Sequence, residues 1–205
     1  EEIDVQIERL SGLYGRDLVN YNALFLGQHD ALNAQPETLL YAAEKGLSRL
    51  GLRNSYMQGC SLFLFGSADS FLRAEDSLFY ELDRMGCRVY INLGLESADQ
   101  ETLDAIGKPV KAARVGECFT RLMEINERCD HIEVTANFVM GSGLPAGHYH
   151  SFLDLVRERV GAPRTKGTVY LSPILGEQPS QRMLFEFNQL KRLSRLPVFL
   201  YTIQR

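Results

Sequence analysis

The sequence has few of the features that mark membrane, secreted or nucleic-acid-binding proteins. Its 205 residues include no tryptophan and no apolar run that approaches the ~20 residues of a membrane-spanning helix. No positively charged segment leading into an apolar one opens the sequence, which predicts a protein without a secretory leader. The net charge of −4 gives no basic footprint for a nucleic acid. We therefore expect a cytoplasmic protein with neither a membrane nor a nucleic acid as its partner.

Cysteine is scarce as well, and no two cysteines lie at a short metal-ligand spacing. With 45% hydrophobic residues, a chain of this length can form a sizeable core and does not need a disulfide framework. We expect reduced, partly buried thiols and no metal site among them. The four are Cys60, Cys87, Cys118 and Cys129.

What the sequence does contain is a unit repeated four times: an apolar run, a glycine, and polar residues that lead into an amphipathic helix. Continuous apolar runs are typical of parallel strands that are buried on both faces. Parallel strands need helical crossovers, and the groups at their carboxyl ends gather at one edge of the sheet. The polar residues after each glycine are therefore the first candidates for a binding site. The runs end at Gly27, Gly66, Gly94 and Gly141.

The alternation of helical and strand patterns predicts a parallel α/β fold. A closed eight-stranded barrel takes about 250 residues. We therefore expect an incomplete TIM-type (β/α) barrel without its first strand over residues 1–175, with an open doubly wound sheet as the alternative. Residues 176–205 are expected to add a helix and a strand, in the same domain or at the start of a flanking one. The predicted strands are 22–26, 61–65, 88–93, 132–140 and 168–171, with a sixth at 198–203.

The segment after the first predicted strand reads Gly27-Gln28-His29-Asp30. Glycine lets main-chain groups approach a ligand closely, and the Asp30 carboxylate could accept a hydrogen bond from a ligand ammonium group. The alternative is a tight turn in which Asp30 caps a helix.

The segment after the third strand offers a carboxylate and, further along, an ammonium group. At the mouth of a barrel, Glu96 could accept hydrogen bonds from a ribose or an amine. Lys108 follows a broken helix and could pair with a ligand carboxylate. The alternatives are a solvated Glu96, a Ser97 that caps the next helix in a box with Gln100, and an exposed surface lysine.

The loop 141–147 is too rich in glycine to be regular structure, and it matches neither a P-loop nor a dinucleotide fingerprint. Its main-chain donors could surround a planar or anionic group. Because the sequence nominates no third ligand, we interpret His148 and His150 as polar residues at a helix start and not as metal ligands. Leu171 ends the fifth strand and packs either on a ligand ring or in the core.

Taken in order, these segments resemble the motifs of radical S-adenosylmethionine (radical SAM) enzymes. LGQHD at 26–30 resembles the segment that receives the methionine ammonium group, and LGLES at 93–97 resembles the ribose motif. ETLDAIGK at 101–108 continues that motif, and VMGSGLP at 139–145 resembles the segment along the adenine. The resemblance is nearest to the oxygen-independent coproporphyrinogen oxidase and methylthiotransferase-like branches.

The resemblance implies a binding site for S-adenosylmethionine, with three groups of residues on different parts of the ligand. Gly27, Gln28 and Asp30 would lie near the methionine moiety. Glu96 and Ser97 would contact the ribose or the amino group, and Lys108 would meet the carboxylate. Met140, Gly141 and Leu171 would flank the adenine.

The sequence departs from the family at the iron–sulfur cluster. It has no CxxxCxxC loop to hold a [4Fe–4S] cluster. The family's LPGE ending is also absent, because the sequence reads Leu144-Pro145-Ala146-Gly147 and lacks the glutamate. We therefore expect a fragment or a degenerate member that is inactive alone. The complete enzyme would take an electron from a donor, cleave S-adenosylmethionine reductively to a 5′-deoxyadenosyl radical, and act on a substrate that the sequence does not identify. The alternatives are a non-catalytic scaffold or binding protein and an unrelated barrel enzyme that uses the carboxylates of Glu96 and Asp30.

Overall fold

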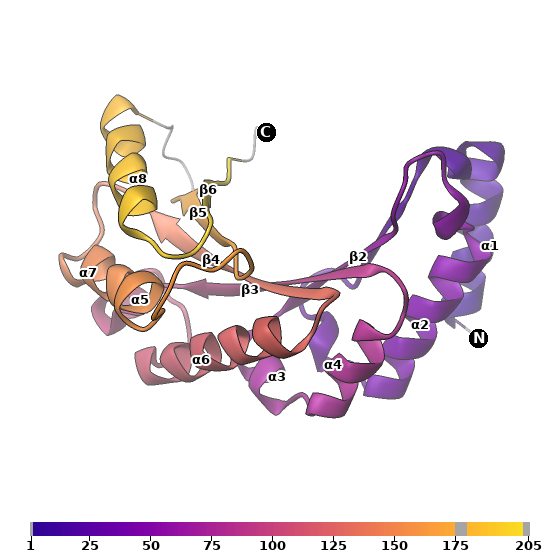
Figure 1. The fold of residues 1–205 in the computed structure, drawn as a ribbon, viewed down its shortest axis with the longest axis horizontal. Helices are drawn as coiled ribbons and strands as arrows, with labels where there is room; N and C mark the ends of the chain where they lie inside the picture. Colours follow the sequence, from indigo (N-terminus) through magenta and orange to yellow (C-terminus); the bar gives the residue numbers. More distant parts are fainter. Residues whose placement is uncertain (1, 175–179, 203–205) are drawn as a thin grey trace. The chain divides into compact units, whose positions relative to one another are not determined.

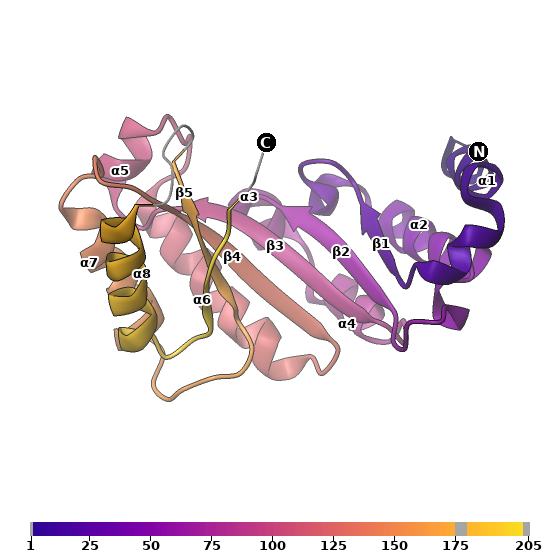
Figure 2. The ribbon, with the colours of Figure 1, turned by 90° about the horizontal axis from the view of Figure 1, so that it is seen from above.

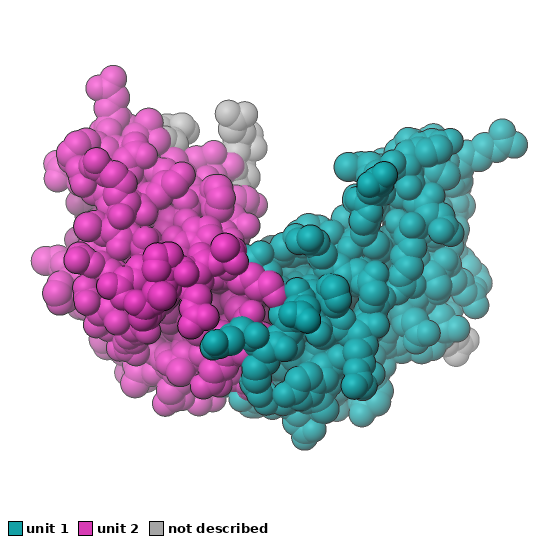
Figure 3. All heavy atoms as spheres, in the orientation of Figure 1, with its two compact units in different colours: residues 1–92, 127–133 teal, residues 93–126, 134–205 magenta. Residues whose placement is uncertain are grey.

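The structure is a computed structural model that describes residues 2–174 and 180–202. The chain divides into two compact units, which Figure 3 shows in different colours. Unit 1 comprises residues 1–92 and 127–133, and unit 2 comprises residues 93–126 and 134–205. Each unit contains its own buried apolar side chains.

The strands follow one another in the sheet in the order in which they occur in the sequence, β1-β2-β3-β4-β5-β6. The pairs β1–β2, β4–β5 and β5–β6 are parallel. A doubly wound sheet reverses its strand order at a switch point, whereas a barrel adds each strand beside the last. The order therefore confirms the predicted α/β fold and favours the incomplete barrel over the doubly wound sheet. The strands are β1 Ala23–Leu26, β2 Ser61–Gly66, β3 Arg88–Glu96, β4 Ile132–Met140, β5 Val169–Pro173 and β6 Val198–Leu200.

In unit 1, helices pack against the buried face of β1 and β2. Helix α2 has a proline at its start, and Leu39, Ala43 and Leu47 lie at helical spacing on its buried face. In β2, Leu62 and Leu64 are buried. Figure 1 shows α3 and α4 on the same side of β2. The helices are α1 Glu2–Tyr14, α2 Pro36–Arg49, α3 Ala68–Arg73 and α4 Asp76–Asp83, with short 3-10 helices η1 Gly15–Asn20, η2 Ala31–Asn33 and η3 Leu52–Asn54.

The other face of these strands carries aromatic side chains that remain partly exposed. Phe25 is 52% exposed, and its ring stacks on Phe63 with 6.4 Å between centroids. Phe63 in turn stacks on Tyr90 at 5.1 Å. The prediction that the strands are buried on both faces is therefore wrong for unit 1. Aromatic rings on neighbouring strands shield one another by stacking, so an apolar run does not require a second covering layer.

In unit 2, α7 is a short helix. It covers Gly147–Leu153 and passes into a π-helical segment, η4, at Asp154–Glu158. Leu155 and Val156 of this segment are buried, whereas Leu153 is only partly buried. The other helices are α5 Gln100–Ala105, α6 Ala112–Arg128 and α8 Gln181–Leu193. Helix α5 lies beside α7 (Figure 1).

In unit 2, a side chain of α6 forms the hydrogen bonds of the β4 main chain just before the pairing of β4 with β5 begins. Asn126 of α6 donates from Nδ2 to the Val134 carbonyl at 2.8 Å and accepts from the Val134 N–H at 2.7 Å. The pairing of β4 with β5 begins two residues later, at Ala136. The buried amide of Asn126 thus satisfies main-chain groups that β5 does not reach.

The C-terminal helix and strand continue the same architecture. Strand β6 pairs in parallel with β5, with Val169 opposite Val198. The predicted boundary between residues 175 and 176, and the predicted strand residue Ile203, lie outside the described residues. Helix α8 packs against β6, and Figure 2 shows this helix from above. In the part of the chain that the structure describes, no helix combines the length and the apolarity needed to cross a membrane.

Candidate functional site

Strand β3 ends in a tight turn that places Glu96 in an unusual conformation. Glu96 has φ = 65°, and among the described residues it is the only non-glycine residue with a positive φ. The Ser97 N–H donates to the Leu95 carbonyl at 2.8 Å, which makes Glu96 the centre of a γ-turn. A left-handed conformation costs a non-glycine residue about 1–2 kcal/mol, so surrounding interactions must hold it.

Lys108 faces Glu96 because the end of α5 directs it there. The Lys108 N–H donates to the Leu103 carbonyl and the Gly107 N–H donates to Asp104, which is a Schellman motif with Gly107 at φ = 67°. The Lys108 Nζ lies 3.4 Å from Glu96 Oε1. The two side chains are 35% and 25% exposed, so the pair is open to solvent or a ligand. The structure thus brings these two predicted residues together.

Ser97 is buried, and its hydroxyl has partners within unit 2. The hydroxyl lies 2.8 Å from His148 Nδ1 and accepts from the Asp99 N–H at 3.0 Å. The alternative that Ser97 caps the next helix is wrong: the N-cap of α5 is Asp99, whose carboxylate accepts from the Thr102 N–H and hydroxyl. Asp99 gains this role because it lies directly before the helix, three residues from Thr102.

His148 is fully buried between Ser97 and β4. Its Nε2 lies 2.8 Å from the Val139 carbonyl, which can only accept, so Nε2 carries the proton and Nδ1 accepts from the Ser97 hydroxyl. Burial lowers the pKa of His148. His148 is therefore a neutral histidine in the core. The sequence correctly predicted that it lies at the start of a helix, but not that its side chain is buried. Its spacing to Phe152 and Leu155 was the available signal, since the three share the buried face.

In unit 1, the segment after β1 fixes a carboxylate in a different way. Gly27 has φ = 74°, and a Cβ there would lie 3.1 Å from the Ala31 Cβ. The Asp30 carboxylate accepts from the buried Ser70 hydroxyl at 2.6 Å. Ser70 also forms the capping box of α3 with Ser67. The side chain of Asp30 makes no capping bond to η2, so the helix-cap alternative is wrong.

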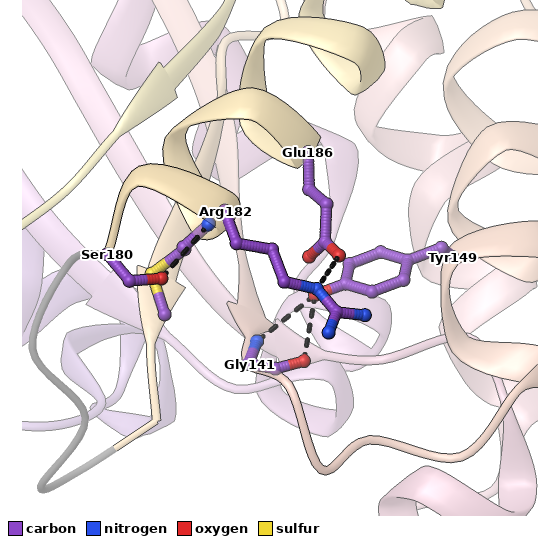
Figure 4. Close-up of polar contacts among 6 residues, drawn as sticks. Gly141, Tyr149, Ser180, Arg182 and Glu186 are labelled. Carbon is purple, nitrogen blue, oxygen red and sulfur yellow. Dashed lines mark hydrogen bonds and ion pairs between the residues drawn. The ribbon is translucent and has the colours of Figure 1, made fainter.

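At the end of β4, the predicted adenine-flanking residues interact mainly within the protein. The Tyr149 hydroxyl accepts from the Gly141 N–H and donates to the Gly141 carbonyl, both at 3.1 Å (Figure 4). Met140 and Leu171 have fully buried side chains in the core. The carbonyls of these two residues already accept from the Ile174 and Tyr201 N–H groups. A ligand acceptor that takes the Gly141 N–H has to displace the Tyr149 hydroxyl.

Helix α8 directs a charged pair toward the same end of β4. Figure 4 shows Arg182 and Glu186 pointing toward Tyr149 and Gly141. Arg182 Nε donates to Glu186 Oε1 at 3.2 Å, and Ser180 caps the helix through the Met183 N–H. The sequence gives no signal for these two residues, because an Arg–Glu pair at this spacing is equally typical of an exposed helix face without a site.

The described cysteines do not fit a [4Fe–4S] cluster. All four are buried, and no group of three or more potential metal ligands occurs among residues 2–174 and 180–202. Burial raises the pKa of Cys87 to about 11, and it raises the pKa of Cys60 as well. Because a thiolate is the form that binds iron, these thiols are poor ligands. The expectation of reduced, buried thiols agrees with this structure.

The nine predicted site residues fall into the two units. Gly27, Gln28 and Asp30 belong to unit 1. Glu96, Ser97, Lys108, Met140, Gly141 and Leu171 belong to unit 2, where the first three form one connected group. The role of each toward a ligand stays a prediction.

No protein-family model matches the sequence, and no curated protein matches it. Among solved structures, Elp3 from the archaeon Methanocaldococcus infernus, with an N-terminal deletion, is similar over 98% of this chain and 52% of its own, with 13% identity and a TM-score of 0.55. The likeness shows a shared fold.

Two further structures are similar at a lower level. A radical SAM methyltransferase from Sphaerobacter thermophilus is 14% identical over 83% of this chain and 49% of its own, with a TM-score of 0.49. OxsB, a cobalamin-dependent S-adenosylmethionine radical enzyme, is 15% identical over 90% of this chain and 25% of its own, also with a TM-score of 0.49. This chain therefore spans about half, or less, of the length of the three structures.

Proposed function

We propose that unit 2 carries a binding site for S-adenosylmethionine and that this chain is the cofactor- and substrate-positioning part of a radical SAM enzyme. The observation that carries the proposal is the γ-turn after β3, which holds the Glu96 carboxylate against Lys108 in a segment that resembles the ribose motif. Strained non-glycine residues cluster at ligand sites, where the strain helps to preorganise the site and the surrounding structure holds it. The fold shared with Elp3 is compatible with this proposal.

The Glu96–Lys108 pair has the chemistry that an adenosyl sulfonium with an amino-acid tail requires. A carboxylate accepts from ribose hydroxyls, and one of the three Lys108 donors already meets Glu96. The remaining two donors are available for the ligand carboxylate. The Gly141 main chain is the proposed contact for the adenine edge once the Tyr149 hydroxyl moves. Gly27, Gln28 and Asp30 stay assigned to the methionine moiety by the sequence resemblance alone.

The chemistry that this ligand would supply to such enzymes is a 5′-deoxyadenosyl radical, which forms with methionine when one electron from a donor cleaves the carbon–sulfur bond of the sulfonium. Because the described cysteines do not fit the cluster, we assign no electron transfer to this chain. Anaerobic reconstitution of the isolated chain is expected to give no stoichiometric [4Fe–4S] uptake and no cleavage of S-adenosylmethionine. Uptake together with cleavage would show that the chain is a complete enzyme. The site does not identify the substrate or the electron donor of the complete enzyme.

Calorimetric titration of the chain with S-adenosylmethionine tests the binding proposal. Glu96→Gln and Lys108→Met are each expected to weaken binding by tenfold or more, since a hydrogen bond to a charged group contributes about 1.5–3 kcal/mol. Glu101→Gln and Lys111→Met are matched controls, because both residues are exposed neighbours with the same charges. No binding by the unmodified chain, or equal losses in the controls, would overturn the proposal.

A further inference from the structure

His148 is a buried titratable side chain that the proposed ligand contacts do not use. It is 0% exposed, and both ring nitrogens have hydrogen-bond partners at 2.8 Å. A buried imidazole of this kind contributes apolar packing and two fixed hydrogen bonds, but leucine or phenylalanine would pack without the need to satisfy polar atoms. The polar contacts therefore require a reason beyond core filling.

The Nδ1 contact leads directly to the γ-turn of Glu96. The Ser97 main chain closes that turn on the Leu95 carbonyl, and the Ser97 side chain is fixed by His148 on one side and by the Asp99 N–H on the other. A serine free to rotate would leave the strained turn without this support. The two hydrogen bonds of the hydroxyl thus fix the residue that follows Glu96.

The opposite edge of the imidazole is tied to the sheet. The Nε2–H donates to the Val139 carbonyl of β4, so the ring has one orientation and one tautomer. The first residue of α7, Gly147, also leaves space for Asp99, because a Cβ at Gly147 would lie only 2.6 Å from Asp99 Oδ1. Helix α7 therefore supplies both the ring and the room for Asp99.

We propose that His148 is a positioning residue that, through the Ser97 hydroxyl, holds the γ-turn that presents Glu96 to the ligand. The part that concerns the ligand rests on the proposed function, whereas the part that concerns the turn does not. His148 itself touches no ligand atom in this proposal.

Two substitutions at residue 148 separate its two hydrogen bonds. In His148→Asn, the side-chain oxygen takes the place of Nδ1 and can still accept from Ser97, while the bond to Val139 is lost. In His148→Gln, the side-chain NH₂ takes the place of the Nε2–H and can still donate to Val139, while the acceptor for Ser97 is lost. Ser97→Ala removes the same contact from the other side, and His150→Gln is an exposed control on the same helix.

The primary readout is hydrogen exchange of the Ser97 amide, measured by NMR, because this amide closes the γ-turn. We expect exchange to accelerate about tenfold or more in His148→Gln and Ser97→Ala, with no such change in His148→Asn, His150→Gln or the amides of α6. Adding His148→Gln to Ser97→Ala is expected to change the exchange little, since the contact with His148 is already absent in Ser97→Ala, which also removes the acceptor of the Asp99 N–H. Equal acceleration in His148→Asn and His148→Gln, or none in Ser97→Ala, would overturn the proposal.

Titration of the same variants with S-adenosylmethionine distinguishes this inference from the proposed function. Binding is expected to weaken about tenfold in His148→Gln and Ser97→Ala and to stay within twofold in His148→Asn. If exchange changes as expected but the unmodified chain binds no S-adenosylmethionine, the proposed function fails and the support of the turn stands. If the chain binds and His148→Gln binds equally well despite faster exchange, the positioning role is overturned.

Discussion

The turns after β1 and β3 reach a similar backbone conformation by different means. Each needs one residue with positive φ: Gly27 at 74° and Glu96 at 65°. After β1 the residue is a glycine, and the carboxylate belongs to Asp30, three residues later. After β3 the residue in the unfavourable conformation carries the carboxylate itself. A carboxylate on the strained residue gains a fixed direction, but the turn then depends on buried neighbours such as Ser97.

The largest expected effect is at Ser70, which fixes the carboxylate after β1. Ser70→Ala removes a 2.6 Å bond to the Asp30 carboxylate and half of the α3 capping box. We expect a loss of about 2–3 kcal/mol in the free energy of unfolding, from one charge-assisted bond and one cap. Urea denaturation measures it. Ser77→Ala is the control, because Ser77 is exposed and bonds only its neighbour Glu75; a loss as large there would contradict the role of Asp30.

Gly27→Ala tests whether the first turn needs a glycine. The alanine has to adopt φ near 74° with its Cβ 3.1 Å from Ala31, so we expect a loss of about 1–2 kcal/mol. Gly12→Ala is the matched control, since Gly12 lies in α1 with nothing within 4 Å of its Cβ position. There the same change is expected to stabilise by about 0.5–1 kcal/mol. Thermal melts of both variants give the comparison, and equal signs would refute it.

Much of this contrast was predictable from the sequence, but its causes were not. The apolar runs and helix-end glycines predicted the strands, the parallel fold and the broken helix before Lys108. The partners of Asp30 and Ser97 lie 40 and 51 residues away in the sequence, at Ser70 and His148. Local pattern rules evaluate side chains against near neighbours, and therefore offered helix caps as the alternative to a ligand contact for Asp30 and Ser97. The π-helical segment after α7 is another non-local outcome, because its sequence has the same apolar spacing as a regular helix.

The histidine that supports the second turn predicts a pH dependence of the free energy of unfolding. Burial lowers the pKa of His148 in the folded protein, while in the unfolded chain it is about 6.5. Below pH 6.5 the unfolded chain therefore takes up a proton that the folded protein does not. The free energy of unfolding falls with pH there, by up to about 1.4 kcal/mol per pH unit, until the folded pKa is reached, and the contribution is complete above pH 6.5.

The measurement is urea denaturation of the unmodified chain and of His148→Asn at pH 7.5 and pH 5.5. Other titrating groups are common to both proteins, so the difference between the two isolates His148. We expect the advantage of the unmodified chain to shrink as the pH drops. An advantage that stays constant or grows would show that the imidazole is not held neutral.

Glu96→Gly makes the turn after β3 like the turn after β1, because it places a glycine at the residue with positive φ. The substitution relieves the left-handed conformation, and it removes a partly exposed ion pair with Lys108 that contributes about 0–1 kcal/mol. We expect a net gain of about 0.5 kcal/mol in the free energy of unfolding together with a loss of S-adenosylmethionine binding. Glu101→Gly in α5 is the control and is expected to destabilise by about 1 kcal/mol without affecting binding. If Glu96→Gly instead destabilises the chain, contacts of the glutamate stabilise the fold, and the turn has a structural role only. A gain in stability together with a loss of binding means that the strain at Glu96 is retained because the ligand needs the carboxylate there.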